Sequence, residues 1–192
     1  RGELGDAEKG VLEDRIAARG RGLRPSRVDL DSDGLADLFV DYAKGVDMSV
    51  DRVASMEDVP ARVADYLARE NLPANLRVAP DPSLDGIPWE KRPTLTITRG
   101  KTDGSDEVGL TGAFAGVAET GTLIMRSGPE HPTTLNFLPD SHLVVIRKSQ
   151  IVGSYEDAWD KIRDGEMPRT VNFIAGPSRT GDIEQTIFMG AH

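Results

Sequence analysis

Residues 143–175 read LVVIRKSQIVGSYEDAWDKIRDGEMPRTVNFIA, and the order of patterns in this stretch decides the fold class. Residues 143–146 are continuously apolar, which is typical of a strand covered on both faces. Residues 155–164 have helical spacing, with Ala158, Trp159 and Ile162 on the inner face, and residues 171–175 form a second short apolar run. A strand, a helix and a strand in this order indicate an α/β protein whose sheet is largely parallel.

The same alternation extends toward the N-terminus. Residues 94–98 (TLTIT) alternate as a strand does, so we expect the central sheet to contain strands near 94–98, 121–126, 143–147 and 171–175. Before residue 73 the chain is predicted to be mainly helical, with helices over about 4–19, 32–45 and 57–71; the second is capped by Ser32 or Asp33. Residues 76–79 are a short apolar run, and we interpret the Pro-rich stretch 73–93 as a long surface loop.

The last predicted element is a helix over about 181–190 that presents Ile183, Ile187 and Phe188. No strand follows it before His192. Because the helix of an α/β unit normally returns the chain to the sheet, we expect a closing strand to be missing from this sequence. The 192 residues are otherwise expected to form one domain, since a domain typically has about 150 residues.

Composition excludes several classes of function. The chain has no cysteine and three histidines, so disulfides, cysteine-ligated iron–sulfur clusters and a thiolate zinc site are not expected on it. The formal charge of 23 − 32 = −9 argues against nucleic-acid binding, which depends on neutralising phosphates. No apolar run approaches the roughly 18 residues of a membrane span, and no apolar leader is present, so we expect a cytoplasmic protein.

Two loops carry candidate chemistry, and the first is Gly176–Gly181, written GPSRTG. A loop that leads into a helix offers backbone N–H groups and a positive dipole end to an anion. Ser178 and Thr180 add hydroxyl donors, and Arg179 adds a planar fork suited to carboxylate or phosphate. The alternative is that these hydroxyls only cap the predicted helix, whose first turn holds Asp182 and Glu184.

The second loop is the polar island Ala118-Glu119-Thr120-Gly121-Thr122 between two apolar runs. A carboxylate at a strand end could act as a general base, a nucleophile or a ligand, although a surface turn is the simpler interpretation. His142, at the start of the apolar run 143–146, is expected to make a structural hydrogen bond. The candidate catalytic residue is therefore Glu119, with no metal ligand, and the candidate ligand-binding residues are Thr120, Gly121, Thr122, His142, Gly176, Ser178, Arg179, Thr180, Asp182 and Glu184.

Three segments carry a family resemblance: VNFIAGPSRTGDIEQTIFMGAH (171–192), GAFAGVAETGTLIMRSG (112–128) and LPDSHLVVI (138–146). They closely resemble the lactate utilization protein C family, the LUD-domain proteins. The resemblance is good over about 105–192 and looser before that. It implies a three-layer α/β fold like that of ribose-5-phosphate isomerase, glucosamine-phosphate deaminase and the CoA transferases, preceded here by a helical portion.

The resemblance also implies partners. Members of the family act with two iron–sulfur proteins in the oxidation of L-lactate to pyruvate, and a chain without cysteine would leave the clusters to those partners. This predicts a subunit that assembles with iron–sulfur proteins and binds a small anionic metabolite. The alternative is a stand-alone enzyme that acts on a carboxylate, acyl or phosphorylated substrate, in which Glu119 lies within about 10 Å of Ser178 and Arg179 in one pocket.

Overall fold

The structure is a computed structural model, and it describes residues 5–18, 20–180 and 188–189. Its α-helices are α1 (Asp6–Ala17), α2 (Ser32–Gly45), α3 (Val59–Arg69) and α4 (Tyr155–Arg163). Its strands are β1 (Asn75–Val78), β2 (Thr96–Arg99), β3 (Val108–Gly112), β4 (Ala115–Val117), β5 (Thr122–Arg126), β6 (Ser141–Val145), β7 (Ile151–Val152), β8 (Val171–Ile174), β9 (Arg179–Thr180) and β10 (Phe188–Met189). The α/β class is confirmed, as are the four helices and four strands predicted before residue 176.

Side-chain caps fix where two of the helices begin. Asp31 precedes α2, and its Oδ1 accepts a hydrogen bond from the Gly34 N–H at 2.8 Å. Ser154 precedes α4, and its Oγ accepts a bond from the Asp157 N–H at 3.3 Å. Such bonds satisfy amide groups that have no partner within the helix. The sequence predicted Ser32 or Asp33 as the cap of α2, but the residue whose side chain caps this helix is Asp31.

The first sheet is parallel throughout, in the order β2-β1-β3-β6. The interpretation of 73–93 as a surface loop is wrong in two respects. Residues 75–78 form β1, an interior strand on which Leu76 and Val78 are buried. Leu84 and Ile87, farther along the same stretch, are buried as well. The prolines suggested a loop, but none lies within β1: Pro73 precedes the strand and the others follow it, where a missing N–H costs no sheet hydrogen bond.

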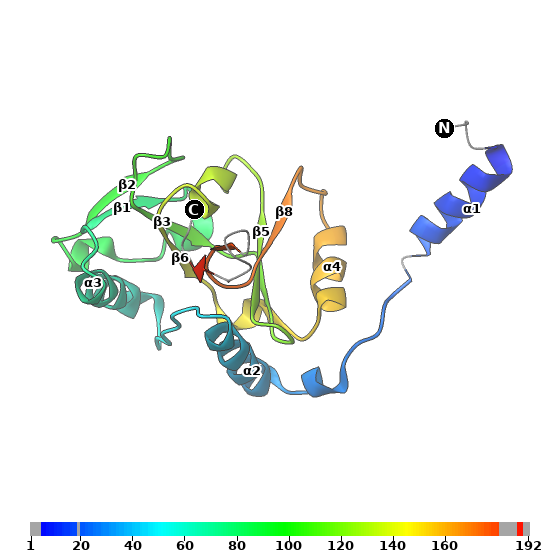
Figure 1. The fold of residues 1–192 in the computed structure, drawn as a ribbon, viewed down its shortest axis with the longest axis horizontal. Helices are drawn as coiled ribbons and strands as arrows, with labels where there is room; N and C mark the ends of the chain where they lie inside the picture. The colour runs from blue at the N-terminus through cyan, green and yellow to red at the C-terminus, as the bar shows by residue number, and fades with distance from the viewer. Residues whose placement is uncertain (1–4, 19, 181–187, 190–192) are drawn as a thin grey trace.

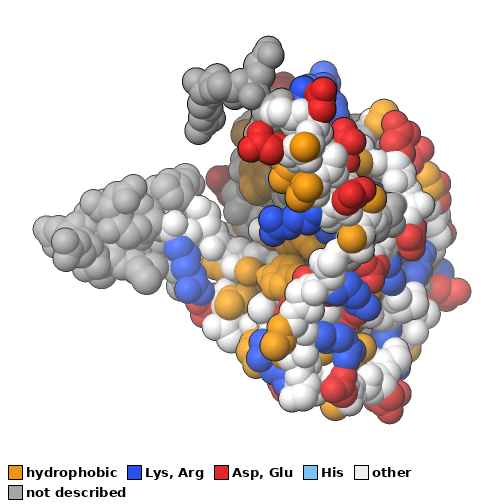
Figure 2. Space-filling model, turned by 90° about the vertical axis from the view of Figure 1, so that its right-hand side faces the viewer, with side chains coloured by type: hydrophobic (Ala, Val, Ile, Leu, Met, Phe, Trp, Pro, Cys, Tyr) orange, Lys and Arg blue, Asp and Glu red, His pale blue; other side chains and the backbone are white. Residues whose placement is uncertain are grey.

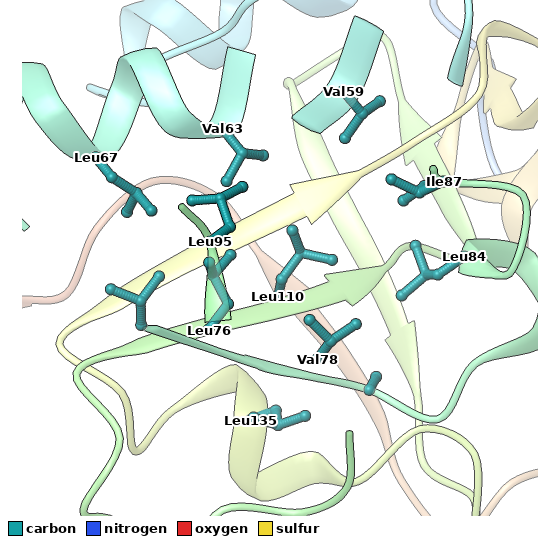
Figure 3. Packing of buried hydrophobic residues seen from close by; sticks show 12 residues of the cluster. Val59, Val63, Leu67, Leu76, Val78, Leu84, Ile87, Leu95, Leu110 and Leu135 are labelled. Atoms are coloured by element: carbon teal, nitrogen blue, oxygen red, sulfur yellow. The ribbon is translucent and has the colours of Figure 1, made fainter. Parts of the chain in front are cut away.

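The core of this half lies between α3 and the first sheet. The inner face of α3 packs on the strands through Val59, Val63 and Leu67 (Figure 3). Leu135 packs on the strands from their opposite side. The opposite face has a tight contact at Gly109, where a Cβ would be 3.1 Å from the Leu135 carbonyl oxygen. Helix and loop therefore cover both faces of the strands that lead to the pocket described below.

The second sheet has the order β7-β4-β5-β8, in which only the β4–β7 pair is parallel. The four predicted strands therefore belong to two sheets rather than one. The reason is the turn between β4 and β5, where Gly121 has φ +66° and the chain reverses into an antiparallel hairpin. Helix α2 packs on one face of this sheet through Phe39 and Ala43, and α4 packs on the other through Ala158 and Ile162.

Two segments of the chain run from the first sheet into the second. Only residues 113–114 separate β3 from β4, and residues 146–150 separate β6 from β7. The pairing continues through this joint, since the Ala113 N–H donates to the Val145 carbonyl at 3.2 Å. The parallel pair β3–β6 of the first sheet thus becomes the parallel pair β4–β7 of the second.

The ends of the chain differ from expectation. Helix α1 forms as predicted, but it has no buried residue and stands apart from the sheets (Figure 1). Viewed from that side, apolar side chains are exposed among charged ones (Figure 2).

At the C-terminal end, β9 and β10 pair antiparallel, so the predicted helix over 181–190 is wrong at 188–189. Residues 181–187 and 190 lie outside the described residues. Among the helices that the structure describes, none is long and apolar enough to cross a bilayer.

Candidate functional site

A pocket of about 210 Å³ opens at the joint between the two sheets. Its walls come from the segments after β1 and β3, the end of β5, and the loops that follow β5 and β6. The lining residues are Asp81, Ser83, Thr111, Gly112, Ala113, Phe114, Met125, Arg126, His131, Asn136 and Gln150. Most of them carry polar groups, so the pocket suits a small polar ligand.

Sheet topology explains the position of the pocket. Strand β1 pairs with β2 on one side and β3 on the other, so the order of strands reverses between β1 and β3. In open parallel sheets, ligands bind in the crevice outside the carboxyl ends of the strands at such a reversal. Asp81 follows the end of β1 and Thr111 lies at the end of β3, and both line the pocket.

Asp81 is the buried acid of the pocket and is 4% exposed. Its Oδ1 accepts a hydrogen bond from the Ser83 N–H at 2.8 Å and so caps the short 3₁₀ helix Pro82–Leu84. The sequence favours this local structure, because proline suits the first position of a helical turn and aspartate suits its cap. The other carboxylate oxygen, Oδ2, lies 3.4 Å from Nδ1 of His131. Asp81 is therefore held on one side by backbone and faces an imidazole on the other.

Gly112 allows the acid to approach β3. A Cβ at this position would lie 2.5 Å from Asp81 Oδ2 and 2.7 Å from Ser83 Oγ, distances that a real side chain does not reach. The last residue of β3 thus forms a backbone wall directly against the carboxylate. A side chain here would have to displace Asp81 or Ser83.

Arg126 is the basic group of the pocket. It ends β5, and its guanidinium carbon lies 3.9 Å from the centre of the Phe114 ring. Stacking on an aromatic face orients the guanidinium plane without using its N–H donors. Within the described part of the chain, no carboxylate lies within 4.0 Å of Arg126 to form an ion pair with it. As far as the described residues are concerned, the donors of Arg126 are therefore available to a ligand.

His142 supports the wall of the pocket without lining it. Its Nε2 lies 2.8 Å from Oγ1 of Thr111, which does line the pocket. Burial lowers the pKa of His142 from 6.5 to about 4, because the charged imidazolium would lose its hydration. The ring is therefore neutral at pH 7, and it fixes the hydroxyl of Thr111.

The predicted catalytic residue Glu119 lies elsewhere. It follows β4, is 7% exposed, and accepts a hydrogen bond through Oε1 from the Tyr155 N–H at 2.9 Å, at the start of α4. Beside it, Thr120, Thr122 and the Tyr155 hydroxyl form a cluster with oxygen separations of 2.8–3.0 Å. None of these residues lines the pocket.

The 176–181 loop is also separate from the pocket. Arg179 donates through Nη2 to Oδ2 of Asp47 at 2.6 Å, so part of its fork already has a partner. Both candidate loops lie against the C-terminal end of α2: a Cβ on Gly121 would overlap the backbone of Ala43, and a Cβ on Gly176 would overlap the Val46 carbonyl. Asp182 and Glu184 lie outside the described residues.

Sequence analysis missed the principal pocket residues Asp81, Arg126 and His131, although two signals were available. The apolar run 76–79 immediately precedes Pro80-Asp81-Pro82, and Arg126 ends a predicted strand. Had 76–79 been paired in parallel with 94–98, the rule for strand ends would have pointed to Asp81. His131 had no such signal, because its loop follows no regular pattern. In the described residues, no group of three or more His, Asp or Glu side chains is placed to hold a metal ion.

The fold and the pocket define a class: an α/β protein with a small polar crevice at a reversal of strand order. A family model, the LUD domain, matches residues 36–192. The chain belongs to the LUD domain family.

Individual relatives match a shorter part of the chain. An uncharacterised protein of Neisseria meningitidis serogroup B is 39% identical over 88 residues, which is 45% of this chain and 38% of that protein. Lactate utilization protein C of Anoxybacillus flavithermus is 35% identical over 85 residues (44% and 39%), and that of Bacillus subtilis is 32% identical over 90 residues (44% and 38%). These matches span about two fifths of the relatives' length.

A solved structure supports the fold. The crystal structure of a DUF162 family protein from Deinococcus radiodurans has a TM-score of 0.59 and covers 77% of this chain and 90% of its own. The sequences are 23% identical, so the likeness concerns the fold alone.

Proposed function

We propose that this protein is a component of a lactate-utilization system and that the pocket at the sheet joint binds a small carboxylate. The observation that carries the proposal is Arg126, a cation without a carboxylate partner among the described residues, stacked on Phe114 in the pocket wall. The names of relatives, lactate utilization protein C, support the physiological setting.

The size and donors of the pocket suit such a ligand. Its volume of about 210 Å³ is below the roughly 300–1,000 Å³ of sites for drug-sized molecules, so it favours a ligand of a few heavy atoms. A guanidinium binds a carboxylate through two parallel N–H···O bonds, and these charge-assisted bonds are stronger than neutral ones. An anion of three carbon atoms matches both properties.

The wider role that we propose follows the family resemblance. The protein acts in the cytoplasm beside iron–sulfur partner proteins in the oxidation of L-lactate to pyruvate, and the partners hold the clusters. The absence of cysteine from this chain supports that division, since clusters are held by cysteine thiolates. Copurification of the chain with those partners, followed by lactate-oxidation assays with and without it, tests this role.

The alternative enzyme, built on Glu119 and the 176–181 loop, has less support. Glu119 is engaged by the Tyr155 amide, and Arg179 is engaged by Asp47. Both groups would have to release these partners before they contacted a substrate. In contrast, no carboxylate of the described part of the chain forms an ion pair with Arg126 in the pocket, so a ligand there would displace no such partner.

NMR titration of the protein with L-lactate and pyruvate distinguishes the two locations. We expect shifts at Arg126 and the neighbouring 111–114 segment, and we expect Arg126→Ala to weaken binding at least tenfold. Arg179→Ala is the matched control and leaves affinity unchanged. Binding that survives the loss of Arg126 and disappears with the loss of Arg179 would move the anion site to the 176–181 loop. No binding of either carboxylate would reject the proposed function.

A further inference from the structure

We propose that Asp81 and His131 form a pair that recognises the hydroxyl at C2 of a 2-hydroxycarboxylate, so that the pocket distinguishes such a ligand from a carboxylate without that oxygen. The inference rests on the proposed function, in which Arg126 holds the carboxylate. It assigns the selectivity of the pocket to two residues that come from separate loops.

The first step concerns Asp81, whose carboxylate cannot turn freely. Oδ1 is held by the Ser83 N–H at 2.8 Å, and the Gly112 backbone lies against Oδ2. At 4% exposure, little water reaches the group. Its remaining acceptor capacity is therefore directed at His131, whose Nδ1 lies 3.4 Å from Oδ2.

The second step concerns the imidazole. A carboxylate beside Nδ1 favours the tautomer in which Nδ1 carries the proton, which leaves Nε2 as an acceptor in the neutral ring. The backbone of His131 is fixed by two hydrogen bonds with Gly128, His131 N–H to Gly128 carbonyl at 3.1 Å and the reverse at 3.3 Å. Nδ1 thus faces Asp81, and no hydrogen bond within the described residues engages Nε2, so that nitrogen can accept from a ligand in the pocket that the ring lines.

The third step is the match between these groups and a ligand. Arg126 offers only donors, and so it selects the carboxylate end. Nε2 of His131 is an acceptor, and so it selects a donor, which the hydroxyl of a 2-hydroxycarboxylate supplies. A ligand with hydrogen at C2 supplies no donor, and a 2-oxo group presents a second acceptor. A site built to bond a hydroxyl discriminates against analogues without it, because the polar groups of the site then stay unpaired.

Calorimetric or NMR titration with L-lactate, propionate and pyruvate tests the inference on the 192-residue chain. We expect wild type to bind L-lactate about five- to tenfold more tightly than propionate, the effect of one hydrogen bond. His131→Asn keeps an N–H donor toward Asp81 but removes Nε2, and it should reduce the preference to about one without weakening propionate. Asp81→Asn, which can still cap Ser83, should reduce the preference as well.

The outcomes separate this inference from the proposed function. Equal affinity of wild type for L-lactate and propionate, both dependent on Arg126, overturns the role of Asp81 and His131 and leaves the carboxylate site intact. An unchanged preference in folded His131→Asn also overturns it, with folding checked by thermal denaturation. If His131→Asn does not fold, the ratio of L-lactate to propionate affinity in wild type and in Asp81→Asn still tests the inference. Absence of all binding overturns the proposed function itself.

Discussion

Gly112 and Asp81 are in direct apposition: a Cβ on the glycine would lie 2.5 Å from one carboxylate oxygen of the acid. The residue that ends β3 thus determines how deep the acid after β1 can lie. Because the pair spans the two strands at which strand order reverses, it links the geometry of the sheet to the geometry of the pocket.

The first prediction follows from this apposition. Gly112→Ala should lower the free energy of unfolding by about 1–3 kcal/mol, the usual cost of overpacking, and should displace Asp81 and weaken ligand binding. Urea denaturation and lactate titration measure the two effects. Gly86→Ala is the control, since a Cβ there meets nothing within 4 Å. Equal behaviour of the two variants would contradict the close contact.

The second prediction concerns the turn between β4 and β5. Gly121 has φ +66°, and a Cβ on it would overlap the Ala43 backbone of α2. Gly121→Ala should therefore destabilise the fold by roughly 2–6 kcal/mol, the sum of backbone strain and overpacking. Gly45→Ala, in the last turn of α2 with open space around it, should be neutral or slightly stabilising. Thermal or urea unfolding of both variants provides the comparison.

The third prediction concerns pH. The pKa of His142 is about 4 in the folded protein because of burial, whereas in the unfolded chain the imidazole has its ordinary pKa near 6.5. Between pH 6.5 and 4 the unfolded chain therefore binds a proton that the folded chain does not. The free energy of unfolding should fall as pH is lowered through this window, by up to roughly 3 kcal/mol.

Replacing the imidazole checks this dependence. His142→Gln keeps a polar group near Thr111 but does not titrate. Urea denaturation at pH 7 and pH 5 should show a smaller loss of stability for the variant than for wild type. Parallel losses in the two proteins would assign the effect to other groups.

The fourth prediction concerns the N-terminal arm, residues 20–25. Asp157 holds this arm to α4, since its carboxylate accepts from Arg21 at 2.8 Å and from Arg24 at 3.4 Å. Burial raises the pKa of Asp157, but hydrogen bonds from Ser154 and the two arginines lower it further, so the group stays ionised at neutral pH. Asp157→Asn should speed trypsin cleavage after Arg21 several-fold; the bond after Arg24 precedes Pro25 and is not a trypsin site. Asp160→Asn should have a smaller effect, because among the described residues the Asp160 carboxylate forms an ion pair with Arg21 alone, at 3.2 Å.

Elements with a clear period were predictable from the sequence. The helix near 57–71 and the strand near 171–175 formed where their spacing of apolar residues placed them. Pairing was not predictable in the same way, because it depends on contacts between distant segments. Residues 121–126 became antiparallel to their neighbours only because Gly121 permits a tight turn against α2.

The site was predicted less well than the fold. Glu119 and Arg179 were selected for their residue types next to apolar runs, but local sequence does not reveal that the Tyr155 amide and Asp47 occupy them. Asp81 was overlooked because its neighbouring prolines suggested an exposed loop. Its burial comes from the close packing of Gly112, which lies about thirty residues away in sequence and is visible only in three dimensions.

The two segments that run from one sheet into the other have a consequence for how the protein unfolds. Residues 108–117 and 141–152 each supply one strand to each sheet, so melting of one sheet releases an end of two strands of the other at the joint. Neither half should therefore persist as an intermediate, and amides in β3 and β4 should exchange with solvent at the same, global rate. A ligand bound at the joint would contact both halves at once, so the stability it adds should slow exchange equally in β1 of one sheet and β5 of the other.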